Sequence, residues 1–136
     1  MSNVRRMNED LPLLYRWFRA HGVKGLTPWH FLEQDRDQQR IQSLRKEYSL
    51  EVGGTSDIWP FAVRQDMDTI AAFLVEAGEV KDLVVTVHLT WTGKKELPGW
   101  PSEALRQPFQ RWLAEVLIAD AAEWMTEEDL EDILNP

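Results

Sequence analysis

The sequence feature that most constrains the fold is a run of strand-like segments between residues 57 and 91. Three apolar segments follow one another there: Ile58–Val63, Thr69–Val75 and Asp82–Trp91. The middle segment is apolar on both faces, which is typical of a central strand covered on both sides. The connections Arg64–Asp68 and Ala77–Glu79 are short, so we expect consecutive strands to pair in an antiparallel meander.

Two of these segments carry further information. Pro60 cannot donate a hydrogen bond to a neighbouring strand, so the first segment is expected to lie at a sheet edge or to contain a bulge. The last segment alternates between an apolar and a more polar face. The apolar face holds Val85, Val87, Leu89 and Trp91, and the polar face holds Val84, Thr86, His88 and Thr90.

Helical spacing before the strands predicts two helices. The first is expected between a cap at Asn8 or Asp10 and Gly22, with Pro12 in its first turn and the apolar stripe Leu11, Leu14, Tyr15 and Phe18. Trp17 lies off this stripe, where it either covers an edge of the core or marks a contact surface. Gly25–Leu32 is predicted to be extended, because Pro28 disfavours helical backbone at the residue before it. A second, largely exposed helix is expected over Asp35–Tyr48, because the stripe of Ile41, Leu44, Arg45 and Tyr48 has helical spacing.

Helices are also predicted after the strands. Thr92–Gln107 is interpreted as a loop in which Ser102–Leu105 could form a helical turn. A third helix begins at Pro108 with the stripe Phe109, Trp112, Leu113, Val116 and Leu117. Thr126–Asp129 has the spacing of a capping box, with a short terminal helix after it. Residues 1–136 are therefore predicted to form a single α+β domain, an antiparallel β-meander sheet flanked by N-terminal and C-terminal helices.

The net charge of −8 is concentrated at one end of the chain. After Arg111 there are eight acids and no Lys or Arg, and the other 15 acids balance the 15 Lys and Arg that precede. This acidic end would repel nucleic acid and anionic membrane and attract a basic partner, unless it is only a solvated helix face. The N-terminus Met1–Asp10 is too polar for a secretory signal and no apolar run is long enough to span a membrane. We therefore expect a cytoplasmic protein that binds neither nucleic acid nor membrane.

Motifs for catalysis or cofactor binding are missing from the sequence. Without Cys there is no disulfide, no thiol nucleophile and no Cys-ligated metal. No serine stands in a GxSxG motif, and no Gly-rich phosphate loop is present. We therefore expect no catalytic residue, no cofactor and no metal. The remaining alternative is a small metal- or nucleotide-dependent enzyme that uses His88, Asp66 and Asp68, although these residues also suit a sheet histidine and an ordinary turn.

Seven Trp are more than a core of this size commonly uses. Trp100 lies in a loop between Pro98 and Pro101, where it has little reason to be buried. Aromatic side chains beside an acidic rim are typical of a protein-binding surface, although each one can instead cover an edge of the core. The predicted partner-binding residues are the aromatic and acidic ones of this end of the chain: Trp100, Glu123, Trp124, Glu127, Glu128, Asp129, Glu131 and Asp132.

Four motifs occur in an order that resembles a known family. They are Ile58-Trp-Pro-Phe-Ala62, Asp66-Met-Asp-Thr-Ile-Ala-Ala-Phe73, Leu83 to Trp91, and Phe109-Gln-Arg-Trp-Leu113. As an ordered set spread over about half the chain, they resemble the SUKH superfamily, which includes a fungal cell-wall-synthesis regulator and many bacterial immunity proteins. Arg64-Gln65 stand where that family usually has glycines.

The resemblance implies a small α+β binding module and not a catalyst. Many relatives are immunity proteins that bind and neutralise a toxin domain, often a nuclease. Nucleases present basic surfaces, so an acidic inhibitor would associate with them rapidly through charge complementarity. The leading hypothesis is therefore a cytoplasmic immunity protein that binds a basic toxin domain. The alternative is a regulatory scaffold that binds a host protein without inhibiting a toxin.

Overall fold

An antiparallel sheet forms the centre of the computed structural model, which describes residues 10–52, 57–65, 69–88, 102–103 and 106–125. Each strand pairs with its neighbour in sequence, so the spatial order of the strands is their order in the chain. This arrangement confirms the predicted α+β class and the antiparallel meander. The strands of the described residues are β1 Gly25–Leu26, β2 Trp29–Phe31, β3 Asp57–Arg64, β4 Thr69–Glu76, β5 Glu79–His88 and β6 Ser102–Glu103.

The predicted irregularity at Pro60 is a bulge. Pro60 pairs with Ala72, but the next pair joins Ala62 to Ala71, so Phe61 is the extra residue of β3. The alternative expectation, that this strand lies at a sheet edge, is wrong because β3 lies between β2 and β4. Because of this bulge, the side chain of Phe61 points into the core. Its ring stacks on that of Phe73, with 4.4 Å between the two centroids.

The turn between β4 and β5 has the backbone of a tight hairpin. Ala77 and Gly78 both have positive φ, 51° and 77°, and the pair Glu76–Glu79 closes the turn. Positive φ at both central residues is the type I′ geometry that matches the twist of paired strands. Strand β5 therefore begins at Glu79, three residues before the predicted start at Asp82.

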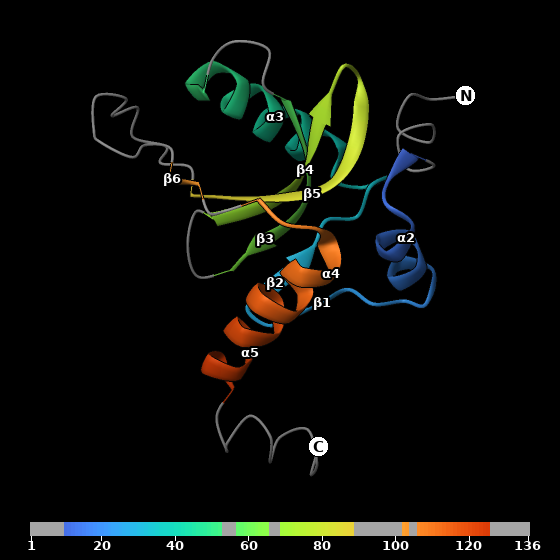
Figure 1. The fold of residues 1–136 in the computed structure, drawn as a ribbon, viewed down its shortest axis with the longest axis vertical. Coiled ribbons are helices and arrows are strands. Elements are labelled where there is room, and N and C mark those ends of the chain that lie inside the picture. The colour runs from blue at the N-terminus through green and yellow to red at the C-terminus, as the bar shows by residue number, and fades with distance from the viewer. Residues whose placement is uncertain (1–9, 53–56, 66–68, 89–101, 104–105, 126–136) are drawn as a thin grey trace.

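Helices cover both faces of the sheet (Figure 1). Helix α3, Gln38–Val52, lies on one side, and its predicted stripe of Ile41, Leu44 and Tyr48 is buried. Helix α2, Leu13–Ala20, and the C-terminal helices lie on the other side. The third predicted helix runs over 109–124 as α4 Phe109–Trp112, a π-helical turn η1 Leu113–Leu117, and α5 Ile118–Trp124.

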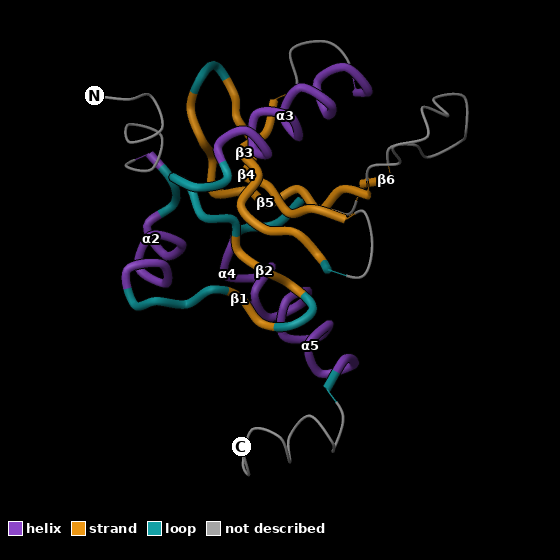
Figure 2. The backbone as a smooth tube through the Cα atoms, turned by 180° about the vertical axis from the view of Figure 1, so that it is seen from behind, coloured by secondary structure: helices purple, strands orange, loops and turns teal. Residues whose placement is uncertain are grey.

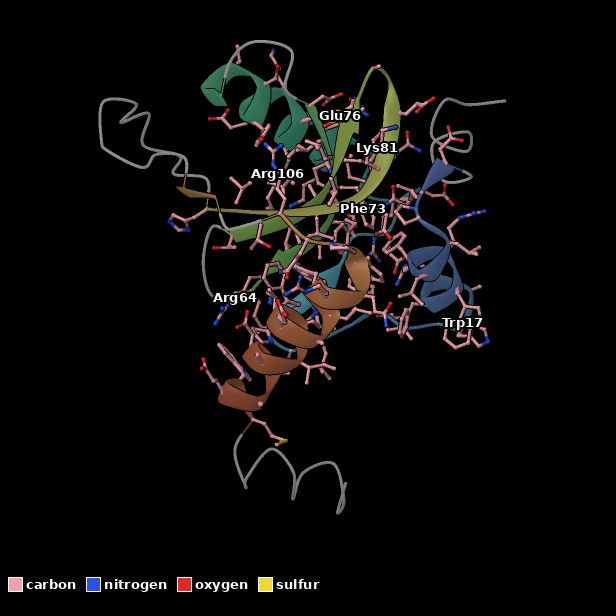
Figure 3. The ribbon with its side chains drawn as sticks, viewed as in Figure 1. Trp17, Arg64, Phe73, Glu76, Lys81 and Arg106 are labelled. Carbon is pink, nitrogen blue, oxygen red and sulfur yellow. The ribbon has the colours of Figure 1, made fainter. Side chains whose placement is uncertain are left out.

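The core between α2, α4 and the sheet is built from aromatic rings. The ring of Tyr15 lies 5.4 Å from those of Phe61 and Phe73 and 5.7 Å from that of Phe109. Phe73 points from the sheet toward α4 (Figure 3). Burial raises the pKa of Tyr15 above 10.0, an effect that the hydrogen bond from Gln34 opposes.

The remaining expectations are in part wrong, in part confirmed and in part outside the described residues. The helical turn over Ser102–Leu105 is wrong, because Ser102 and Glu103 pair as strand β6 with His88 and Val87 of β5. The stretch Gly25–Leu32 is extended as expected, and it forms the hairpin β1–β2. The capping box, the terminal helix and the last residues of the predicted long strand lie outside the described residues.

Candidate protein-binding surface

The predicted partner-binding residues that the structure describes are Glu123 and Trp124. Both lie at the end of α5, where Glu123 is exposed and Trp124 is 37% exposed. The C-terminal end of α5 projects beyond the strands (Figure 1), so its last turn is not covered by the sheet. The other predicted residues, Trp100, Glu127, Glu128, Asp129, Glu131 and Asp132, lie outside the described residues.

Three of the Trp side chains that the structure describes are buried, and each indole N–H donates a hydrogen bond. Trp29 donates to Asp120 at 2.8 Å, Trp59 to Gln34 at 2.9 Å and Trp112 to Thr86 at 3.0 Å. Because a buried N–H without an acceptor is costly, these partners allow the large rings to serve as core. Much of the unusual Trp content is therefore structural. Trp91 lies outside the described residues.

Asp120 connects the last helix to the sheet. Its Oδ2 accepts hydrogen bonds from Trp29 Nε1 at 2.8 Å and from Arg64 Nη1 at 3.1 Å. Figure 2 shows the β1–β2 hairpin beside α4 and α5, and Figure 3 shows Arg64 beside the helix. The side chains of Arg64 and Asp120 are only 20% and 22% exposed, so this ion pair is partly shielded from water. Asp120 therefore fixes the position of α5, and its charge is directed inward.

The remaining described acids of this end differ in their partners. Glu115 accepts hydrogen bonds from Arg111 one turn earlier in the helix, and both side chains are more than half exposed. For Glu123 the described residues supply neither a hydrogen bond nor an ion pair. The acidic end is thus not a uniform solvated face: Asp120 contributes to the fold, and Glu123 is open to solvent.

The outer face of α5 is apolar, which the sequence analysis missed. Ile118 is 56% exposed and Met125 is 58% exposed, and the exposed Ala122 lies between them at helical spacing. We name Ile118, Ala122 and Met125 the α5 ridge. The sequence contains this face as a second apolar stripe with the spacing i, i+4 and i+7. It lies opposite the core-facing stripe of the same helix.

A second exposed apolar surface lies on α2. Leu13 is 73% exposed and Trp17 is 54% exposed, and the Trp17 ring lies 4.0 Å from the ring of His21. Figure 3 shows Trp17 on the outer side of α2, away from the sheet. Of the two interpretations of Trp17, the structure favours an exposed surface over a covered core edge.

Of the candidate metal or nucleotide residues His88, Asp66 and Asp68, the structure describes His88. His88 is half-buried, and its Nδ1 lies 3.2 Å from Thr69 Oγ1, which is a hydrogen bond between paired strands. Asp66 and Asp68 lie outside the described residues. In the part of the chain that the structure describes, no three His, Cys, Asp or Glu side chains are grouped to hold a metal ion.

Among the described residues, no helix combines the length and the apolar character needed to cross a membrane. Comparison with family models, with curated proteins and with solved structures finds no match for this chain.

Proposed function

We propose that this chain is a non-catalytic protein-binding module, an immunity protein of the cytoplasm that binds and neutralises a basic toxin domain. The observation that carries the proposal is the surface at the end of α5, where the apolar Ile118 and Met125 are more than half exposed and the exposed Glu123 of the last turn has no partner among the described residues. Apolar side chains with a charged rim are the usual composition of a protein interface.

The fixed position of α5 also supports the proposal. Asp120 holds the helix against Trp29 and Arg64, so α5 presents its outer face without first having to order itself. A surface that is already ordered loses less conformational entropy on binding, which favours tight inhibition.

The resemblance to the SUKH superfamily supports the proposal through the fold. Its motif residues Phe61, Phe73, Phe109 and Trp112 are buried, so they specify the core and not the binding surface. The acidic end of the chain lies after these motifs in the sequence. A common core with a divergent surface is what a family of inhibitors with different partners requires.

Binding to a toxin tests the proposal. The chain is purified together with the product of the adjacent gene, and the complex is measured by calorimetry at two salt concentrations. We expect a one-to-one complex whose association weakens with salt, and loss of toxin activity in the complex. Absence of any complex with a neighbouring toxin-like product would falsify the proposal.

A regulatory scaffold is the second candidate function. It is favoured by the separate exposed surface of Leu13 and Trp17 on α2, since a scaffold needs two contact surfaces. Gene neighbourhood distinguishes the two candidates: a toxin gene beside this one favours immunity, and a conserved non-toxin neighbour favours the scaffold. The scaffold also predicts that a complex forms without inhibition of an enzyme.

A further inference from the structure

The two ends of the last helical segment are attached to the fold in different ways. In α4 the rings of Phe109 and Trp112 are fully buried. In α5 no residue is buried, and the side chains of the α5 ridge are exposed. Within the described part of the chain, the polar attachment of α5 to the sheet consists of the hydrogen bonds that Asp120 accepts from Trp29 and Arg64. An anchored half, α4, is therefore continuous with a half, α5, that is held mainly by one carboxylate.

The π-helical turn η1 separates these two halves. In a regular α-helix, residues seven apart share a face, whereas Trp112 and Asp120 are eight apart. The wider turn takes up the extra residue. Consequently both side chains reach Trp29: the Trp112 ring with 5.2 Å between centroids, and the Asp120 carboxylate at 2.8 Å from the indole nitrogen. Leu117, the last residue of η1, is also the last buried residue of the described helix, so the boundary between the halves falls there.

Helix α5 is too short to persist once its contacts with the sheet are broken. It has seven residues, and helices shorter than about 12–15 residues are marginal in water without packing. Undocking and unwinding of α5 are therefore expected to occur together. The aromatic core does not depend on α5, because Phe109 of α4 itself contacts the rings of Phe61 at 5.6 Å and Phe73 at 5.8 Å.

From these observations we propose that α5 is a latched segment, which undocks and unwinds as a unit while the rest of the fold stays intact. Asp120 is the latch, and η1 is the boundary of the unit. The undocked state uncovers the side of Trp29 that Asp120 occupies in the docked state. Any partner that binds one of the two states more tightly shifts the balance between them, whether or not that partner is a toxin. The latch thus gives this end of the chain a means of control.

Hydrogen exchange of the intact chain, followed by NMR, tests this proposal. Trp29 and Trp112 are a matched pair, because each is no more than 1% exposed and donates its indole N–H to a side-chain oxygen. Undocking of α5 releases the indole N–H of Trp29 and leaves that of Trp112 bonded to Thr86. We expect the Trp29 indole proton and the α5 amides to have protection factors at least about tenfold below those of the Trp112 indole proton and the β4 amides.

Urea separates undocking of α5 from global unfolding. Denaturant speeds exchange in proportion to the surface exposed on opening, so low urea should speed the β4 amides steeply and the α5 amides weakly. A core variant gives a second separation, because Val85 of β5 is fully buried and lies outside the unit. Val85→Ala should speed exchange of the β4 amides by about tenfold or more and change that of α5 and the Trp29 indole by less than about twofold. If Val85→Ala does not fold, the urea dependence of the wild type decides.

Two substitutions on the helix test whether Asp120 is the latch. Asp120→Ala should lower the protection of the α5 amides by at least about tenfold, because it removes contacts that exist only in the docked state. Glu115→Ala is the matched control, since the ion pair of Glu115 with Arg111 is exposed, and it should change this protection by less than about twofold. Equal effects of the two substitutions would exclude Asp120 as the latch.

Two results in the wild type would overturn the proposal. In the first, the Trp29 indole proton and the α5 amides are protected as strongly as the Trp112 indole proton and the β4 amides, so the chain opens only as a whole. In the second, the α5 amides exchange rapidly while the Trp29 indole proton stays protected, so the helix frays with Asp120 still bonded.

Discussion

Replacement of Asp120 by Ala tests whether one carboxylate holds the last helix to the sheet. The substitution removes the acceptor of the Trp29 indole N–H, which is buried in a side chain only 1% exposed. An unsatisfied buried donor costs about 1–3 kcal/mol. The same change removes the partly shielded ion pair with Arg64, worth about 1 kcal/mol. The sum predicts a loss of about 2–4 kcal/mol in the free energy of unfolding.

Urea unfolding followed by Trp fluorescence measures this loss. Glu115→Ala is the matched control on the same helix, because its ion pair with Arg111 is exposed and is expected to change stability by less than about 0.5 kcal/mol. Asp120→Asn keeps a neutral acceptor for Trp29 and should retain part of the stability. A double-mutant cycle with Trp29→Phe should give a coupling of about 1 kcal/mol or more. If Asp120→Ala costs no more than Glu115→Ala, the reasoning is refuted.

Three further predictions concern the turn, the core and the helix. Ala77→Asn should raise the free energy of unfolding by about 0.5–1 kcal/mol, because Asn tolerates the positive φ of this position better than Ala; a fall in the urea midpoint would contradict this. Burial raises the pKa of Tyr15, so folding favours its protonated form. The contribution of Tyr15 to the free energy of unfolding is therefore present below about pH 10 and should fall as pH rises through the folded-state pKa. Denaturation between about pH 9 and pH 11 should show a smaller decline in Tyr15→Phe than in the wild type, and equal declines would contradict the assignment. Deletion of Ala114 from the π-helical turn should keep Asp120 on the same helix face as Trp112. Insertion of one Ala at this point should displace Asp120 and lower the free energy of unfolding by about 2–4 kcal/mol, as measured by urea unfolding. Equal stability of the deletion and insertion variants would exclude this role of the turn.

Much of the fold followed from local patterns in the sequence. The alternation of Val85 and Val87 along β5 and the uniformly apolar β4 predicted the meander, because strand periodicity and short connections depend only on neighbouring residues. The lack of an N–H in Pro60 predicted either a bulge or a sheet edge for the same reason, and the structure has the bulge. The stripe of Ile41, Leu44 and Tyr48 likewise placed α3 correctly, three residues from its predicted start.

Other features depended on contacts between distant residues. Ser102 and Glu103 pair with the end of β5, which no local pattern indicates. The π-helical turn forms in a helix whose contacts join Trp112 and Asp120 to Trp29, far away in the sequence. One interpretation of the acidic end was a solvated helix face, but Asp120 of this end faces the sheet. The net charge of a segment does not show which of its carboxylates face solvent. That depends on whether the fold places a buried hydrogen-bond donor beside the carboxylate.

The pairing of Trp29 with Asp120 also bears on the order in which the protein folds. The pairs β1–β2, β3–β4 and β4–β5 are joined by short connections, and such local contacts close small loops at low entropic cost. The Trp29–Asp120 bond joins residues 91 positions apart. During synthesis the hairpins can therefore form as the chain emerges, but the indole N–H of Trp29 stays without its acceptor until Asp120 has left the ribosome. Until then the hairpin β1–β2 is open on the side that α5 later covers.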